Sequence, residues 1–235
     1  WEPLFILNYT TGNIDPWLGV SMESNETLDM WTLTLREGVM WSDGEAFNAE
    51  DVVYTIEMLA SEAGSTLPGS EGIGGVVDTV TAVDDLTVEF TLQGPNPRFQ
   101  LDFFSVRSTN SVLIMPEHIW ADEDPTTFTF YAEDGSMPIG TGPYTLTSAE
   151  TNRWVWDRND AWWGVEAGFY DLPEPLRLIW LSVGTEDNRV QLISNNETDA
   201  ANSVSLAAFE VIQSRNPNVI AWETDLPYSW SDPCP

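Results

Sequence analysis

The clearest periodic pattern in the chain is the strict alternation of apolar and polar residues over Trp31–Arg36. Alternation with a period of two predicts a half-buried strand, with Trp31, Leu33 and Leu35 on the buried face. A turn is expected soon after this strand at Ser42–Gly44, because glycine accepts backbone angles that a branched residue does not.

A helix is predicted to begin directly after Asn48. The Asn48 side chain can accept hydrogen bonds from the backbone amides of Glu50 or Asp51, and both acids lie at the positive end of the helix dipole. Apolar residues then recur near helical spacing, which is typical of a helix with one buried face. The residues of this predicted stripe are Val52, Val53, Ile56, Leu59 and Ala60.

The rest of the chain mixes β-rich and helical segments. Strands are predicted at 76–83, 86–92, 144–147, 153–157, 176–181 and 219–222, and helices at 116–120, 186–193 and 204–212. Phe99, Leu101, Phe103 and Phe104 form a segment that we expect in the core. The part before about residue 160 resembles antiparallel β-structure with inserted helices, and the order after residue 176 indicates an α/β unit. The predicted fold class is therefore mixed α/β (α+β).

Acidic residues dominate the charge of the chain. Asp and Glu number 38 against 8 arginines, lysine is absent, and the formal net charge is -30. Nucleic acid is therefore an unfavourable partner, because each contacted phosphate needs a cation, and a P-loop is excluded because it needs a lysine. Salt would screen the self-repulsion, so adaptation to a saline medium and a compositional bias of the lineage both stay open.

The sequence offers few candidates for catalysis or metal binding. His118 is the only histidine and Cys234 the only cysteine, so a metal site built from these residue types is excluded and no cofactor is expected. His118 lies in a predicted helical turn and is expected to be structural or at the surface. Two carboxylates could serve a glycoside hydrolase, but among so many acids any spacing arises by chance. The sequence therefore predicts no catalytic residue, and a secreted glycoside hydrolase with an Asp/Glu pair stays as an alternative.

The 12 tryptophans are more informative about binding. Tryptophan combines a large apolar face with one N–H donor, which suits sugars and peptides. Four of them fall on strand patterns and are expected in the core: Trp31, Trp41, Trp154 and Trp156. Three others lie near turn residues and are freer to face a ligand: Trp17, Trp222 and Trp230.

The stretch Trp31–Tyr54 has a specific order of residues. An aromatic strand is followed by Leu-Arg-Glu-Gly-Val, by Trp-Ser-Asp-Gly, and by Ala-Glu-Asp-Val at the start of the predicted helix. This order resembles the signature of family 5 extracellular solute-binding proteins, the peptide- and oligosaccharide-binding receptors of ABC importers. Gly140–Tyr144 and Arg158–Gly164 agree with the family in order and spacing, whereas Thr198 departs from the family's common Gly-Glu-Ile-Asp phrase.

The resemblance implies a periplasmic-binding-protein-like fold with two lobes and a ligand between them. Residues 1–175 would form the N-terminal lobe with its β-rich subdomain, and residues 176–235 an α/β unit of the same lobe that leads toward the crossing between lobes. The chain starts at Trp1 and stops at Pro235. We expect it to cover about the first half of the family and to lack most of the second lobe.

The signature residues are expected to form the fold, because a strand, a glycine turn and a capped helix are structural devices. The residues assigned this structural role are Trp31, Leu35, Arg36, Gly38, Val39, Trp41, Asp43, Gly44, Asp51, Val52, Gly140, Gly142, Pro143, Tyr144, Arg158, Asn159, Trp163 and Gly164.

Irregular segments are the better candidates for the ligand surface of the first lobe. One is the N-terminal loop, where Asn and Gly between positions 8 and 13 predict a turn. The other follows the strand predicted at 219–222. The candidate ligand-binding residues are Asn8, Tyr9, Trp17, Trp222, Tyr228 and Trp230.

The resemblance implies a receptor without catalysis, which captures oligopeptides by hinge closure and delivers them to an ABC permease. A cello- or other oligosaccharide is the alternative ligand, favoured by the tryptophans and the scarcity of bases to meet a peptide carboxyl terminus. A periplasmic sensor domain that reuses the fold is a third hypothesis. The family further implies a monomer that is periplasmic or extracellular, and a lipid anchor on the outer face of the cytoplasmic membrane is compatible with this location.

Overall fold

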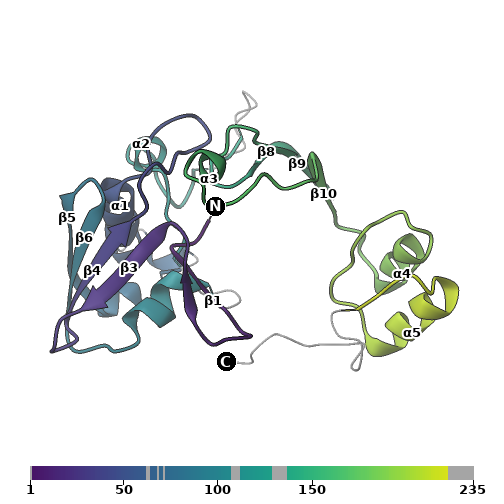
Figure 1. Cartoon of the computed structure of the whole chain (residues 1–235), viewed down its shortest axis with the longest axis horizontal. Helices are drawn as coiled ribbons and strands as arrows, with labels where there is room; N and C mark the ends of the chain where they lie inside the picture. Colours follow the sequence, from purple (N-terminus) through teal and green to yellow (C-terminus); the bar gives the residue numbers. More distant parts are fainter. Residues whose placement is uncertain are drawn as a thin grey trace. The chain divides into compact units, whose positions relative to one another are not determined.

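The computed structural model describes residues 2–61, 64–67, 69–70, 72–106, 112–128 and 137–221, and Figure 1 shows its helices and strands. Contacts within the chain divide it into two units. Unit 1 consists of Trp1–Ser148 and Val155–Leu178, and unit 2 of Ala149–Trp154 and Ile179–Pro235. The assignment of residues 1–175 and 176–235 to a single lobe stays a prediction.

The largest sheet of unit 1 has four antiparallel strands in the order β3-β4-β6-β5. Its strands are β3 (Gly19–Ser24), β4 (Met30–Leu35), β5 (Val77–Asp84) and β6 (Thr87–Leu92). Trp31, Leu33 and Leu35 are the buried residues of β4, which confirms the predicted strand and its buried face. The register places Trp31 opposite Phe90 and Leu33 opposite Val88. The strands predicted at 76–83 and 86–92 are confirmed as β5 and β6, which pair antiparallel.

Helix α1 (Ala49–Ala60) packs against β5 and β6. It begins as predicted: the Asn48 side chain accepts hydrogen bonds from the amides of Glu50 and Asp51 at 2.8 and 3.4 Å. The Asp51 carboxylate in turn accepts from the Asn48 amide at 3.1 Å. Backbone amides at the start of the helix, which have no carbonyl partner within it, are thus hydrogen-bonded to side chains.

The predicted apolar stripe of α1 is partly wrong. Ala60 is exposed and Val53 is half-buried, whereas Thr55 and Met58 are buried. The reason is geometric: about 100° separates successive residues of a helix, so Thr55 and Met58 lie on the opposite side of Ile56 from Val53 and Ala60. The Thr55 hydroxyl fits on that side because it donates to the Asp51 carbonyl at 2.7 Å and accepts from the Met115 amide at 2.9 Å, so the chain around Met115 lies there.

A second sheet of unit 1 has the order β2-β1-β7. Its strands are β1 (Phe5–Leu7), β2 (Ile14–Pro16) and β7 (Ser105–Val106), with β1 antiparallel to β2 and parallel to β7. Before β7 the chain forms a single π-helical turn, η3 (Gln100–Phe104). Phe99 and Phe104 are fully buried, and Leu101 and Phe103 are half-buried. The core prediction for this segment is therefore confirmed for two of its four residues.

Unit 1 also contains short helical elements. They are the 3₁₀ turns η1 (Gly64–Thr66) and η2 (Ile73–Gly75) and the helical turns α2 (Glu117–Trp120) and α3 (Trp163–Glu166). Pro116 precedes α2 as its N-cap and does not lie in its first turn, one position from the prediction.

A third sheet has the order β10-β9-β8, with β8 (Tyr144–Glu150), β9 (Arg153–Arg158) and β10 (Arg177–Leu181). These strands confirm the three predictions made for this part of the chain. In unit 2, the helices α4 (Glu186–Ser194) and α5 (Leu206–Arg215) pack against each other. Helix α5 begins two residues later than predicted, because the Ser205 hydroxyl caps it by accepting from the Ala208 amide at 3.3 Å.

The strand predicted at 219–222 is wrong for its described part. Val219–Ala221 form no strand. The Val219 amide donates to the Asn216 carbonyl at 3.1 Å, which turns the backbone, and the Val219 side chain packs against the small α4–α5 cluster. Trp222 lies outside the described residues. Within the described ranges no helix is long and apolar enough to cross a membrane.

Candidate functional site

The N-terminal turn holds two of the candidate ligand-binding residues. The Asn8 side-chain oxygen accepts from the amides of Thr10 and Thr11 at 3.1 and 3.2 Å, and its nitrogen donates to Asp15 at 3.0 Å. These bonds confirm the predicted turn and commit most of the polar side chain of Asn8 to it. Tyr9 is 64% exposed at the tip. Of the two residues, Tyr9 is therefore the better placed to meet a ligand.

Trp17 contributes its ring to a surface but not its N–H group. The Trp17 indole nitrogen donates to Glu2 Oε1 at 3.0 Å, and the Trp163 indole nitrogen donates to Glu2 Oε2 at 3.1 Å. Glu2 is only 7% exposed. Burial raises the pKa of Glu2, and the hydrogen bonds from Trp17 and Trp163 act in the opposite direction. The donor that could have met a polar ligand is thus used inside the protein.

An aromatic group surrounds Trp17, and we call Trp17, Phe169 and Tyr170 the aromatic platform. Trp17 stacks on Tyr170 with ring centroids 5.5 Å apart, and the edge of Phe169 meets Trp17 at 5.0 Å. Tyr170 is 57% exposed. Arg36 lies over the Phe169 ring at 4.0 Å and donates from Nε to the Trp17 carbonyl at 2.7 Å. The platform can stack against a sugar ring or an apolar peptide side chain.

Sequence reasoning missed Tyr170, since it lies in no periodic element and far from Trp17 along the chain. The remaining candidates, Trp222, Tyr228 and Trp230, lie outside the described residues.

Asp51 explains why the signature around it forms the fold. Its carboxylate is 3% exposed and accepts from the Trp41 indole nitrogen at 3.0 Å and the Glu117 amide at 2.8 Å, besides the Asn48 amide. Burial raises the pKa of Asp51, and these three hydrogen bonds oppose the shift. One carboxylate therefore joins a turn, a helix and the start of α2.

The three signature stretches meet in unit 1. The Ser42 amide donates to the Gly140 carbonyl at 2.9 Å, and the indole nitrogens of Trp162 and Trp163 both donate to the Thr141 carbonyl, at 3.0 and 2.9 Å. A Cβ atom on Gly164 would lie 2.5 Å from the Trp162 ring, so this position requires glycine.

Two further polar contacts involve signature residues nearer the surface, Asp43 and Arg158. His118 Nε2 lies 2.9 Å from Asp43, and Arg158 donates from Nη1 to the Pro173 carbonyl at 2.8 Å. Several of the signature residues are buried: Trp31, Leu35, Val39, Trp41, Asp51, Val52, Trp163 and Gly164. Burial places these side chains in the interior of unit 1, and their assignment as fold-forming residues stays a prediction.

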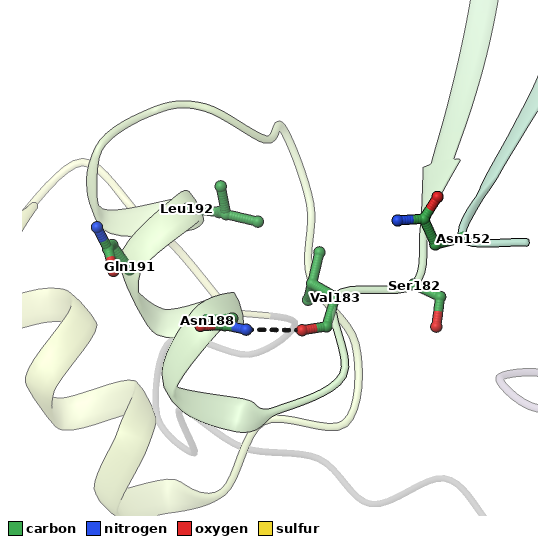
Figure 2. Close-up of a pocket in the computed structure, with 6 residues that line it drawn as sticks. All are labelled: Asn152, Ser182, Val183, Asn188, Gln191 and Leu192. Carbon is green, nitrogen blue, oxygen red and sulfur yellow. Dashed lines mark hydrogen bonds between the residues drawn. The ribbon is translucent and has the colours of Figure 1, made fainter.

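Unit 2 contains a separate open pocket of about 430 Å³. Figure 2 shows its lining residues: Asn152, Ser182, Val183, Asn188, Gln191 and Leu192. All six are uncharged, and Asn188 donates from Nδ2 to the Val183 carbonyl at 2.8 Å. Amides and a hydroxyl beside two aliphatic side chains suit a neutral hydrogen-bonding group. Within the described part of the chain, no group of three or more His, Cys, Asp or Glu residues could hold a metal ion.

Comparison with known proteins assigns the class. Residues 13–230 match the family model of bacterial extracellular solute-binding proteins, family 5 middle. The chain therefore belongs to family 5 of these proteins.

Individual relatives agree with this assignment. Protein XP55 of Streptomyces lividans is 34% identical over 176 residues, which cover 72% of this chain and 28% of the relative. The nickel-binding periplasmic protein of Escherichia coli K12 is 27% identical over 203 residues, 84% of this chain and 36% of the relative.

Among solved structures, the mannohexaose-bound periplasmic oligopeptide-binding protein of an ABC transporter from Thermotoga maritima superimposes with a TM-score of 0.75. It is 27% identical, and the match covers 95% of this chain and 39% of that protein. The fold is thus that of periplasmic binding proteins. The chain spans 28% and 36% of the lengths of the two relatives, less than the half expected from its sequence.

Proposed function

We propose that the protein containing this chain is the solute-binding receptor of an ABC importer, which captures oligopeptides outside the cytoplasmic membrane and performs no catalysis. The family match over residues 13–230 carries this proposal. The partner is a membrane permease, which would recognise the receptor after two lobes have closed on the ligand by hinge motion. A periplasmic or extracellular location follows from the same proposal.

Oligopeptides are the preferred ligand because the Thermotoga maritima structure with 27% identity is described as an oligopeptide-binding protein. Exposed aromatic faces such as Tyr9 and Tyr170 suit the apolar side chains of peptides. Backbone groups of a bound peptide would find neutral hydrogen-bonding partners of the kind that line the pocket of unit 2.

Oligosaccharides are the second candidate, and specific observations favour them. The same Thermotoga maritima protein is described with mannohexaose bound. The chain has no lysine and 8 arginines to meet a peptide carboxylate, whereas stacking on Trp17 and Tyr170 needs no charge on the ligand.

Isothermal titration calorimetry on the complete protein separates the two ligands. Peptides of two to nine residues and cello- and manno-oligosaccharides of matched length are titrated in parallel. We expect saturable 1:1 binding of peptides and no saturable heat with the sugars. Binding of the sugars alone would replace peptide by oligosaccharide.

A different experiment tests whether the protein is a receptor at all. Turnover of a chromogenic glycoside, abolished by one Asp or Glu substitution, would identify the glycoside hydrolase that the acidic residues leave open. Heat-inactivated protein serves as the control for chemical hydrolysis.

A further inference from the structure

The sequence contains three Asn-x-Thr triplets whose middle residue is not proline, at positions 8–10, 25–27 and 196–198. In secreted proteins this triplet is the acceptor motif for N-linked glycans, which are attached to the side-chain nitrogen of the asparagine. The motif is short and arises by chance, so the geometry around each asparagine has to separate the three copies.

The first two asparagines use their side-chain nitrogens inside the fold of unit 1. Asn8 Nδ2 donates to Asp15 at 3.0 Å. Asn25 Nδ2 donates to the Thr27 hydroxyl at 2.9 Å and to Asp29 at 2.8 Å, and the Thr27 hydroxyl donates to Asp29 at 2.5 Å. A sugar on Nδ2 leaves a single N–H group, so glycosylation of Asn25 would break one of these bonds, and a sugar on Asn8 would have to fit beside Asp15.

Asn196 in unit 2 is placed differently. It is exposed, lies two residues after the end of α4 and has a φ of 57°. Its side-chain oxygen accepts from Asn216 Nδ2 at 2.9 Å, and Asn216 is buried. Within the described part of the chain, no hydrogen bond engages Asn196 Nδ2 or the Thr198 hydroxyl. The bond to Asn216 thus holds the amide by its oxygen and leaves its nitrogen available.

The chain after Asn196 is also suited to enter the groove of a modifying enzyme. Residues 197–205, which connect α4 to α5, form neither helix nor strand. Asn25 by contrast lies between the paired strands β3 and β4. An irregular surface loop can rearrange around a partner at lower cost than a turn between two paired strands.

We propose that Asn196 carries an N-linked oligosaccharide, transferred after unit 2 has folded, and that Asn8 and Asn25 stay unmodified. The donor is an oligosaccharide joined through phosphate to a membrane lipid, and the partner is an oligosaccharyltransferase. The bond between the anomeric carbon and the phosphate oxygen breaks, and the lipid phosphate leaves with the electron pair. An N-glycosidic bond forms to Asn196 Nδ2, which gives one proton to a base of the transferase. This inference rests on the proposed location outside the cytoplasmic membrane.

Peptide mapping of the complete protein, purified from its natural source, tests the site. Cleavage after arginine separates the motifs, because residues 190–215 lie between Arg189 and Arg215 and contain only the third, whereas the other two precede Arg36. We expect fragmentation of the glycopeptide to place the oligosaccharide on Asn196. Absence of a glycan from Asn196 would overturn the proposal. Equal modification of all three motifs would overturn it as well, because the folded geometry would then make no selection.

Variants of the motif test the chemistry of the acceptor. Asn196→Gln and Thr198→Ala should each abolish the modification, whereas Thr198→Ser keeps the hydroxyl and should retain it. Asn195→Gln is the matched control, since Asn195 is exposed in the same turn but belongs to no acceptor motif. A glycan in residues 190–215 that survives Asn196→Gln would show that the assigned atom is wrong.

Cell fractionation distinguishes failure of this inference from failure of the receptor proposal. An unmodified Asn196 in protein recovered outside the cytoplasmic membrane would contradict only the glycosylation. Recovery of the protein from the cytoplasm, without a glycan, would contradict both proposals.

Discussion

Unit 1 and unit 2 differ most in the size of their buried apolar clusters. Unit 1 buries a continuous apolar cluster that includes all of Leu33, Val52, Ile56, Phe90 and Phe104, each fully inaccessible. The described cluster of unit 2 is limited to Val190, Ile193 and Ile212. Because burial of apolar surface is the main source of stability, unit 1 has the core of a complete folding unit. The apolar core formed by the described residues of unit 2 is much smaller.

The polar groups of the two units also differ in how deeply they are buried. Asp51 and Glu2 in unit 1 are buried and accept several hydrogen bonds each. The polar residues around the pocket of unit 2, such as Asn152 and Gln191, are exposed. Buried, fully bonded groups fix one conformation, whereas exposed amides remain available to another molecule. The buried carboxylates of unit 1 thus help to fix its conformation.

The largest effect is expected inside the core of unit 1. Ile56→Ala on α1 should destabilise this unit by about 4 kcal/mol, because Ile56 is 0% exposed and its tightly packed neighbours cannot fill the cavity. Hydrogen exchange of peptides from α1 in the complete protein measures the change. Val83→Ala, on the exposed surface of β5, is the control and should change stability by less than about 0.5 kcal/mol.

The same substitution in unit 2 is expected to cost less. Ile212→Ala on α5 should destabilise this unit by about 2 kcal/mol, because a small cluster surrounds Ile212 and can close over the cavity. Exchange of peptides from α5 gives the value. Equal losses for Ile56→Ala and Ile212→Ala would show that the two cores are equally well packed, and the contrast drawn between the units would be wrong.

The aromatic platform and the pocket of unit 2 can be compared through ligand binding. Tyr170→Ala removes the stacked ring and should weaken binding by about 1 kcal/mol, whereas Tyr170→Phe keeps the ring and should bind like the wild type. Gln191→Ala removes one side-chain amide from the lining of the pocket in unit 2, and so tests whether the ligand binds there. Calorimetry on the complete protein supplies all three affinities. If only Gln191→Ala weakens binding, the ligand uses unit 2 and the platform is structural.

A smaller effect concerns the pH dependence of unit 1. Burial raises the pKa of Asp51 above its ordinary value of 3.8. The folded protein then holds the Asp51 proton more tightly than the unfolded chain does. The contribution of Asp51 to the stability of the folded protein therefore falls as the pH rises from the ordinary pKa of this residue through the raised one.

Asp51→Asn removes this titration. The difference in unfolding free energy between wild type and variant, measured by urea denaturation at several pH values, should shift against the wild type as the pH increases across that window. Parallel pH profiles for the two proteins would mean that Asp51 titrates normally.

The smallest expected effect is a general one of salt. At a net charge of -30, raising NaCl from about 0.1 to 1 M shortens the screening length from about 10 to 3 Å and should stabilise both units. Thermal unfolding in a NaCl series measures it. Stability that stays flat or falls would remove the hypothesis of adaptation to a saline medium.

Local elements of both units could be predicted from the sequence. The alternation in Trp31–Arg36, the Asn48 cap and the helices near 186 and 206 each depend on neighbouring residues. The buried side of α1 was predicted only in part, because a segment distant in sequence, around Met115, lies against Thr55.

The candidate site was harder to predict, since its contacts are long-range. Trp17 loses its free N–H to Glu2, and Trp163 reaches Glu2 across 161 positions of sequence. Tyr170 joins Trp17 although no pattern connects the two residues. Tertiary contacts of this kind leave no periodic signal, whereas the family signature was recognisable because its residues follow one another in a specific order along the chain.

As proposed, the complete protein binds its solute and releases it unchanged. Equilibrium dialysis against a mixture of oligopeptides and oligosaccharides, followed by mass spectrometry of the retained and the free molecules, tests it directly. About one oligopeptide per protein molecule should be retained and recovered at its original mass. Recovery of shortened fragments, or retention of nothing from the mixture, would contradict it.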